Sequence, residues 1–342
     1  MITLEALNAL SVDEFTSTLG AIFEHSPWVP QRAALARPFT SRLDLLDAMR
    51  AVVQAAPAEE QLRLIRAHPQ LGARGRKRAE LTEASSREQR RAGLDACTDE
   101  EFDQLLRLNT VYVHKFSFPF ILAVRGHDPN SILASMGSRL NNDPELERHT
   151  ALTQIGLIGG YRLADIVASP AGAEIKAMRD RLATAATDAA PRQADTAASL
   201  LREWMLAANL DLRTGPDGTL AGIQQHDPGE KYLLTGVHLD PTTRILRRDG
   251  SLGALVGIAV AQQIRQKALA PRFNLCVLAT SGTADSDPLA PLRFAGSSFR
   301  YEVYARELAG ADRTNEPPDQ RTLERAAQTL ENVLTQSPQI QK

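Results

Sequence analysis

The sequence has few cysteines and no long apolar run. Only Cys97 and Cys276 are present among 342 residues, and neither has a histidine or cysteine at metal-ligand spacing. Two isolated thiols are typical of a reducing compartment. No stretch approaches the roughly 18 apolar residues of a membrane-spanning helix, and the opening residues carry acids where a signal peptide would be basic. We therefore expect a cytoplasmic protein without membrane contact.

The charge balance also excludes a class of partner. The chain has 39 basic and 41 acidic side chains, a formal net charge of −2, so no overall field attracts nucleic acid. At 342 residues it is long enough for two domains of about 150 residues each. We expect a multidomain protein that does not bind nucleic acid.

Residues 1–168 have the pattern of helices separated by clear breaks. Ser11 with Glu14, and Thr98 with Glu101, have the spacing of a capping box at the start of a helix. Apolar residues follow at helical spacing, and strand patterns are nearly absent. These features predict an all-α helical bundle over residues 1–168.

Two polar side chains stand at neighbouring chain breaks. His68 precedes Pro69, and because a proline disfavours the α conformation of the residue before it, a helix should end there and leave the imidazole at its end. Glu88 follows Ser85 by three positions, again the spacing of a capping box. A loop histidine and a simple cap are one interpretation, and a catalytic pair at the rim of a cleft is the other.

Two later features also allow both a structural and a functional interpretation. Arg162 lies beside the apolar stripe of a long predicted helix over 144–167, where an arginine often only extends its head to water. The apolar run 120–124 follows Pro119 and should be extended and buried. Its backbone N–H and C=O groups then need partners, and a polar ligand is one candidate.

Five motifs occur in an order that resembles one known family. They are FEHSPW at 23–28, HPQLG at 68–72, SSREQ at 85–89, LNTVYVHKFSFPFILAVRG at 108–126 and IGLIGGYRLADIV at 155–167. Together they resemble the 2-oxo-4-hydroxy-4-carboxy-5-ureidoimidazoline (OHCU) decarboxylases of urate breakdown. The resemblance covers about residues 5–168, a whole all-helical domain.

The resemblance implies a substrate, a product and a set of site residues. The substrate would be the small molecule OHCU and the product (S)-allantoin. No cofactor is implied, because the substrate's own ring C=N can accept the electron pair left by CO2. Members of the family often pair, so a homodimer is an open expectation. The residues implied are His68 and Glu88 as catalytic groups and, as substrate-binding groups, Arg162, Ser85, Gln89, Pro69, Phe120, Ile121, Leu122 and Ala123.

One position departs from the family pattern. Ser117 stands where the family usually has a glycine between Lys-Phe and Phe-Pro. If this position requires a positive φ, a serine is strained there, because only glycine adopts that conformation without steric cost.

The rest of the chain changes in composition. Residues 169–195 are rich in Ala, Arg, Asp and Pro, and we interpret them as a linker that is partly helical and then broken at Pro191. Alternating helix and strand patterns then predict a small α/β domain over 196–313, followed by a polar tail over 314–342. The predicted helices are 196–208, 252–266 and 322–334, and the predicted strands are 220–223, 232–237 and 273–279.

The segment LLTGVHLDPTTRILRRDGSLGALVGIAV at 233–260 resembles the first metal segment of the two-zinc amidohydrolases, which include allantoate amidohydrolases. The resemblance makes His238 a zinc ligand, Asp240 its supporting acid and Asp249 the bridging carboxylate. The family's Asp-Glu-Glu after the next strand is missing, and no histidine follows His238. A hydrolytic zinc site needs about three protein ligands and a base, so we expect a truncated remnant without metal.

Three functions follow from these patterns. The favoured one is an OHCU decarboxylase with an inactive appendage. The second is a zinc amidohydrolase acting on allantoate or an N-carbamoyl amino acid, which protein-bound zinc would support. The third is a noncatalytic assembly protein, favoured if Ser117 or the appendage closes the pocket.

Overall fold

The computed structural model divides the chain into two compact units. The N-terminal unit holds Ile2–Phe39 and Asp44–Ile166, and the C-terminal unit holds Met1, Thr40–Leu43 and Val167–Lys342. The residues that the structure describes are 1–72, 85, 86, 88, 90, 92–94, 97–187, 193–215, 218–226, 232–238, 251–271, 274–280, 301–303 and 320–335.

Helices make up most of the N-terminal unit. Both predicted capping boxes are confirmed: Thr98 accepts from the Glu101 N–H while Glu101 accepts from the Thr98 N–H, and Ser11 and Glu14 do the same. The elements are β1 (Ile2–Thr3), α1 (Leu4–Ala9), α2 (Val12–Leu19), α3 (Trp28–Ala33), the 3₁₀ helix η1 (Ala34–Ala36), α4 (Arg42–Ala55), α5 (Ala58–Ala67), α7 (Asp99–Phe116), α8 (Pro129–Arg139) and α9 (Pro144–Ile166).

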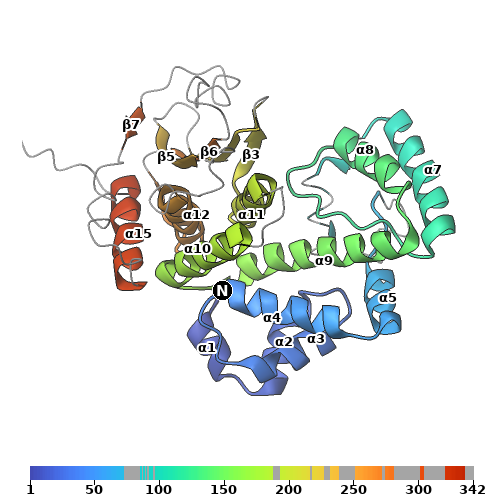
Figure 1. The fold of residues 1–342 in the computed structure, drawn as a ribbon, viewed down its shortest axis with the longest axis horizontal. Coiled ribbons are helices and arrows are strands. Elements are labelled where there is room, and N and C mark those ends of the chain that lie inside the picture. The colour runs from blue at the N-terminus through green and yellow to red at the C-terminus, as the bar shows by residue number, and fades with distance from the viewer. Residues whose placement is uncertain are drawn as a thin grey trace, which may run out of the picture. The chain divides into compact units, whose positions relative to one another are not determined.

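The long helix α9 is the element on which this unit is assembled. Both α5 and α7 pack against it, and α7 also packs against α8 (Figure 1). Two glycines of α9 lie where side chains of other elements come close: a Cβ at Gly156 would lie 2.9 Å from Arg50 Nε, and one at Gly159 would lie 3.2 Å from Phe23 Cζ. Gly159 therefore lets the segment around Phe23 lie directly on α9, one turn before Arg162.

Helix α7 ends at Ser117, whose backbone is left-handed. This is the positive-φ conformation in which the family pattern, with its glycine, predicts strain for a serine. Its φ is 61° and ψ is 22°, and its N–H donates to the Val113 carbonyl to close the helix. A serine in this region is strained, because its Cβ crowds the following carbonyl oxygen. The chain from Phe118 to Val124, here called the extended segment after its predicted conformation, then forms neither helix nor strand. The rings of Phe116, Phe118 and Phe120 surround Tyr112, with ring centroids 4.7–6.2 Å away.

We expect Ser117→Gly to increase the free energy of unfolding by about 0.5–1 kcal/mol, because glycine removes the left-handed strain and loses part of that gain through its more flexible unfolded chain. Urea unfolding of the two proteins measures the difference. Ser117→Ala is the matched control, since alanine keeps the Cβ and so keeps the strain. A glycine variant no more stable than the alanine variant would contradict this explanation.

The C-terminal unit is a five-stranded sheet with helices packed against it. The strand order is β3-β4-β6-β5-β7, in which β5 is parallel to both β6 and β7 while β4 is antiparallel to β3 and β6. Helix α12 packs against β5 and β6 and contacts α10 and α15, and α11 packs against β3 and β4 (Figure 1). The elements are β2 (Val167–Ala168), α10 (Ala171–Thr187), α11 (Gln193–Ala207), β3 (Asp211–Thr214), β4 (Leu220–Gln224), β5 (Tyr232–His238), α12 (Ser251–Gln266), β6 (Asn274–Thr280), β7 (Tyr301–Val303) and α15 (Gln320–Thr335).

Helix α10 occupies most of the segment that the sequence analysis interpreted as a linker over 169–195. Ile175, Met178 and Leu182, spaced as one helical face, are buried in the hydrophobic core of the C-terminal unit. The alanine-rich composition that suggested a linker is also the composition of a strong helix former. The expected helical part of this segment is thus present as Ala171–Thr187, and its buried face makes it part of the C-terminal unit.

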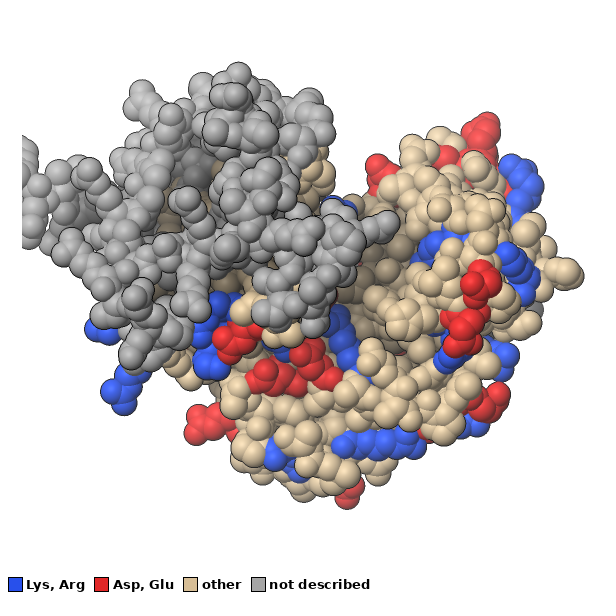
Figure 2. All heavy atoms as spheres, viewed as in Figure 1, with Lys and Arg blue, Asp and Glu red and all other residues tan. Residues whose placement is uncertain are grey.

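Two surface properties bear on partners. Among the described helices, none combines the length and the apolar character that a membrane span requires. On the described surface of the N-terminal unit drawn in Figure 2, lysine and arginine side chains are interspersed with aspartate and glutamate.

Candidate active site

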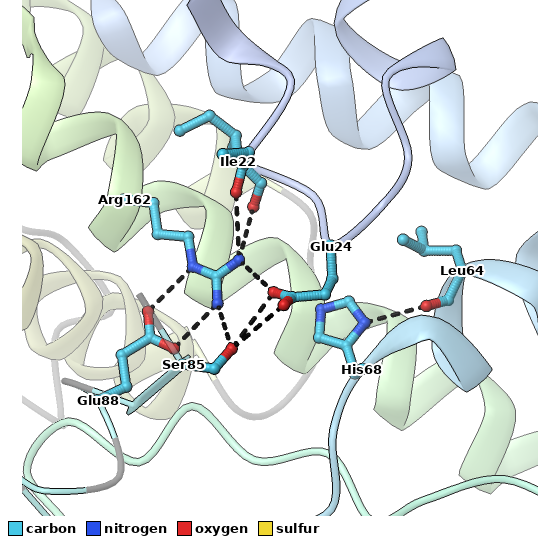
Figure 3. Close-up of polar contacts among 8 residues, drawn as sticks. Ile22, Glu24, Leu64, His68, Ser85, Glu88 and Arg162 are labelled. Carbon is cyan, nitrogen blue, oxygen red and sulfur yellow. Dashed lines mark hydrogen bonds and ion pairs between the residues drawn. The ribbon is translucent and has the colours of Figure 1, made fainter. Parts of the chain in front are cut away.

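A buried arginine is the centre of the candidate site. Arg162, near the end of α9, is 7% exposed and donates from all three guanidinium nitrogens (Figure 3). Its Nε and Nη2 reach the two oxygens of Glu88 at 3.0 and 3.1 Å, and its Nη1 reaches Glu24 Oε2 at 2.8 Å. The fork-shaped pairing with Glu88 is the strong, directional form of an arginine–carboxylate contact.

Ser85 and Glu24 complete the arrangement on the other side of the guanidinium. Ser85 Oγ accepts from Arg162 Nη2 at 3.2 Å and lies 3.3 Å from Glu24 Oε2, to which it donates. The carbonyls of Ala21 and Ile22 accept from Nη1 at 3.3 and 3.4 Å. Ser85 and Glu88, which the sequence allowed as a simple capping box, thus both contact Arg162.

Glu24 is a member of the site that the sequence analysis did not identify. Its 2% exposure is extreme for a carboxylate, and the charge is tolerated because Arg162 and Ser85 both donate to it. The residue lies in the FEHSPW motif quoted for the family resemblance. The signal that could have identified it is an acid directly after the two apolar residues Ile22 and Phe23, where the chain was expected to be buried.

His68 lies where the sequence placed it, at the end of α5 with extended backbone (φ −77°, ψ 138°). The ring is 6% exposed, and Nδ1 is 3.0 Å from the Leu64 carbonyl. Nε2 is buried and has no hydrogen-bond partner among the described residues, and Figure 3 shows this side of the ring turned toward the Glu24 carboxylate. Because a carbonyl can only accept, Nδ1 carries the proton of the neutral ring and Nε2 carries the lone pair.

Burial controls the charge of both basic groups. It lowers the pKa of His68 to about 4, against the opposing effects of the Leu64 carbonyl and the negative charge of Glu24. For Arg162, burial also disfavours the charged form, but Glu88 and Glu24 outweigh it and raise the pKa above its ordinary value. At neutral pH the imidazole of His68 is therefore neutral and the guanidinium of Arg162 is charged.

The extended segment predicted to hold the substrate is buried and anchored. Phe120, Ile121, Leu122 and Ala123 are all less than 8% exposed. The described contacts of its backbone run to α8 and α9: the Ile121 carbonyl accepts from Arg139 Nη1 at 2.8 Å, and the Ala123 N–H donates to Gln154 Oε1 at 3.0 Å. The side chains of Arg139 and Gln154 thus pair with two of the backbone groups for which a ligand was a candidate partner.

Two other groups of predicted site residues are described only in part. Pro69 is half-buried next to His68, whereas Gln89 lies outside the described residues. His238 ends strand β5, but its side chain, Asp240 and Asp249 also lie outside them. Within the described part of the chain, no group of three or more His, Cys, Asp or Glu residues could hold a metal ion.

Comparison with known proteins identifies the family. The profile of the OHCU decarboxylases matches residues 8–164. A 2-oxo-4-hydroxy-4-carboxy-5-ureidoimidazoline decarboxylase from Haloferax volcanii is 42% identical over 164 residues, 48% of this chain and 95% of that protein. This chain belongs to the OHCU decarboxylase family. The matched region includes His68, Glu88, Arg162 and the added residue Glu24.

Other members extend the comparison. The uric acid degradation bifunctional protein PucL from Bacillus subtilis is 40% identical over 176 residues, 52% of this chain and 35% of that protein, so there too the family domain is one part of a longer chain. A solved structure titled (S)-allantoin synthase has 29% identity and a TM-score of 0.40, covering 48% of this chain and 54% of that chain.

Proposed function

We propose that this protein decarboxylates OHCU to (S)-allantoin in urate breakdown, without a cofactor. The observation that carries the proposal is the family match over residues 8–164, which encloses the whole described cluster around Arg162. Its direct test is CO2 release from OHCU formed in situ from urate, which the purified chain should accelerate over spontaneous decay.

The reaction asks little of the protein beyond positioning and proton transfer. Loss of CO2 leaves an electron pair on a ring carbon, and the adjacent ring C=N of the substrate takes it up. The nitrogen of that C=N must gain a proton from solvent as it takes up the pair. The hydroxyl of the substrate must then lose its proton as its oxygen becomes a carbonyl, and the ring carbon that carries the ureido group must gain one on a single face. Groups that hold the substrate and move these protons are sufficient for such a reaction.

His68 is proposed as the group that first accepts a proton. Its Nε2 lone pair is the acceptor that the Leu64 contact leaves, and the ring is neutral at physiological pH because its pKa lies near 4. The substrate hydroxyl is the natural donor to it. The imidazolium so formed lies beside Glu24, whose negative charge favours that charged state. It can then return the proton to carbon.

Arg162 and Glu88 are proposed to orient the substrate. Arg162 offers a fork of donors to a substrate oxygen, and that oxygen would compete with Glu88 for Nε and Nη2. Glu88, once displaced, accepts from ring or ureido N–H groups. Ser85, Gln89, Pro69 and the backbone of residues 120–123 are proposed as the remaining contacts.

The burial of His68 also predicts a pH dependence of stability. Between pH 6.5, its ordinary pKa, and about 4, the unfolded chain binds a proton that the folded chain does not. The free energy of unfolding therefore rises with pH across this window, by up to roughly 3 kcal/mol. Above pH 6.5 the contribution of His68 no longer changes with pH. Urea unfolding from pH 4.5 to 7 measures it. His68→Asn, which can keep a donor near Leu64, should show a smaller slope, and equal slopes would contradict the assignment.

Three further expectations stay proposals. They are the division into a decarboxylase domain over 1–168 and an α/β domain over 196–313, a homodimer, and a cytoplasmic location. Cys97 and Cys276 are not joined in a disulfide, which supports a reducing compartment.

A further inference from the structure

A second buried ion pair lies under the extended segment, away from the Arg162 cluster. Arg139, the last residue of α8, is 11% exposed at its side chain, and its partner Glu147 on α9 is fully buried. Arg139 Nε and Nη2 donate to Glu147 Oε1 at 2.9 and 2.5 Å. Asn142 and the Tyr112 hydroxyl also donate to Glu147, so the carboxylate is held on several sides.

The remaining contacts of Arg139 are with the extended segment. Its Nη1 donates to the Ile121 carbonyl at 2.8 Å, and the guanidinium carbon lies 4.5 Å from the centroid of the Phe120 ring. One planar group thus fixes both the carbonyl of one residue and the ring of its neighbour. Lysine could not make these contacts together with those to Glu147, because its ammonium is a compact point charge and lacks the planar fork of donors of a guanidinium.

Helix α9 links this pair to the candidate active site. Glu147 and Gln154 are seven residues apart on α9, hence on one face, and they hold the segment at Ile121, through Arg139, and at Ala123. Arg162 follows eight residues later on the same helix. The segment is therefore held in register with Arg162 by a single rigid element.

We propose that Arg139 is a positioning residue for the substrate: it acts through the backbone at Phe120 and Ile121, whose place relative to Arg162 it sets. The inference rests on the proposed function, in which this backbone holds the substrate ring. A buried ion pair is often no more stabilising than an apolar pair of similar size, so a role in geometry accounts for its use here better than stability does. A displacement of about 1 Å at a reacting group can cost as much as a hundredfold in rate.

The test compares variants that remove different contacts of Arg139 and Glu147. Arg139→Lys keeps a positive charge beside Glu147 but lacks the planar guanidinium that also contacts the Ile121 carbonyl and the Phe120 ring. Arg139→Gln paired with Glu147→Gln removes both charges together, so that no unpaired carboxylate is left buried and the protein can fold. Asn142→Ala is the control, because it weakens the same buried carboxylate without touching the segment.

Both Arg139 variants should raise KM for OHCU about tenfold and lower the enantiomeric excess of allantoin, since a loosely held ring is protonated on both faces. Asn142→Ala should lose thermal stability while KM and enantiomeric excess stay within about twofold of wild type, because the extended segment keeps its contacts. Arg139 variants with wild-type KM and enantiomeric excess would overturn the inference. If wild-type protein released no CO2 at all, the proposed function itself would fail instead.

Discussion

His68→Ala is expected to lower kcat by about 10²–10⁴-fold while the N-terminal unit stays folded, the usual contribution of a proton-transfer group. The side chain makes one hydrogen bond, from Nδ1 to Leu64, and its other nitrogen has no partner among the described residues. Its removal therefore costs the fold little relative to what it costs a reaction that needs Nε2. Steady-state CO2 release and a far-UV circular dichroism spectrum measure the two effects.

The matched control is His149→Ala, which removes an exposed histidine from α9. It should leave both kcat and the spectrum unchanged. Near-wild-type turnover by His68→Ala would show that this imidazole is only a buried residue at the end of a helix.

Arg162→Gln should affect both activity and stability. Loss of a charged donor to the substrate should reduce kcat/KM by about 10²–10³-fold, as for other donors aimed at a reacting group. The unfolding free energy should fall by about 3–5 kcal/mol, because the buried Glu24 would lose the guanidinium with which it forms an ion pair.

The double variant Glu24→Gln with Arg162→Gln separates the two effects. Removing the buried carboxylate should restore much of the stability while activity stays low, because the fork toward the substrate is still absent. Chemical denaturation and CO2 release on the single and double variants provide the comparison. A single Arg162→Gln variant as stable as wild type would contradict the buried pairing with Glu24.

Local sequence rules predicted features that depend on neighbouring residues. The histidine before a proline predicted the end of α5, and two capping boxes predicted the starts of α2 and α7. The serine at 117, where the family usually has glycine, predicted strain there if φ is positive, as it is. Each depends on steric or hydrogen-bonding constraints within four residues of the position concerned. The strand patterns near 220, 232 and 274 likewise correspond to β4, β5 and β6.

The same rules could not predict contacts between residues that lie far apart in the sequence. Glu24 is 138 residues from Arg162, and the two apolar residues before it can indicate that it is buried but not which residue it pairs with. Helix α10 lies in the segment interpreted as a linker because the composition there shifts to Ala, Arg, Asp and Pro. Its apolar face of Ile175, Met178 and Leu182 becomes recognisable only when it packs on α12 and α15. The short strands β3 and β7 exist through their partners in the sheet, since three or four residues carry too little pattern of their own.

The most direct test of the account is to follow CO2 release and allantoin chirality together, with OHCU formed in situ from urate, before and after treatment with a chelator. We predict accelerated release, (S)-allantoin in excess and no effect of the chelator. Release no faster than spontaneous decay would contradict the decarboxylase proposal, and activity that disappears with the chelator would contradict its independence of metal.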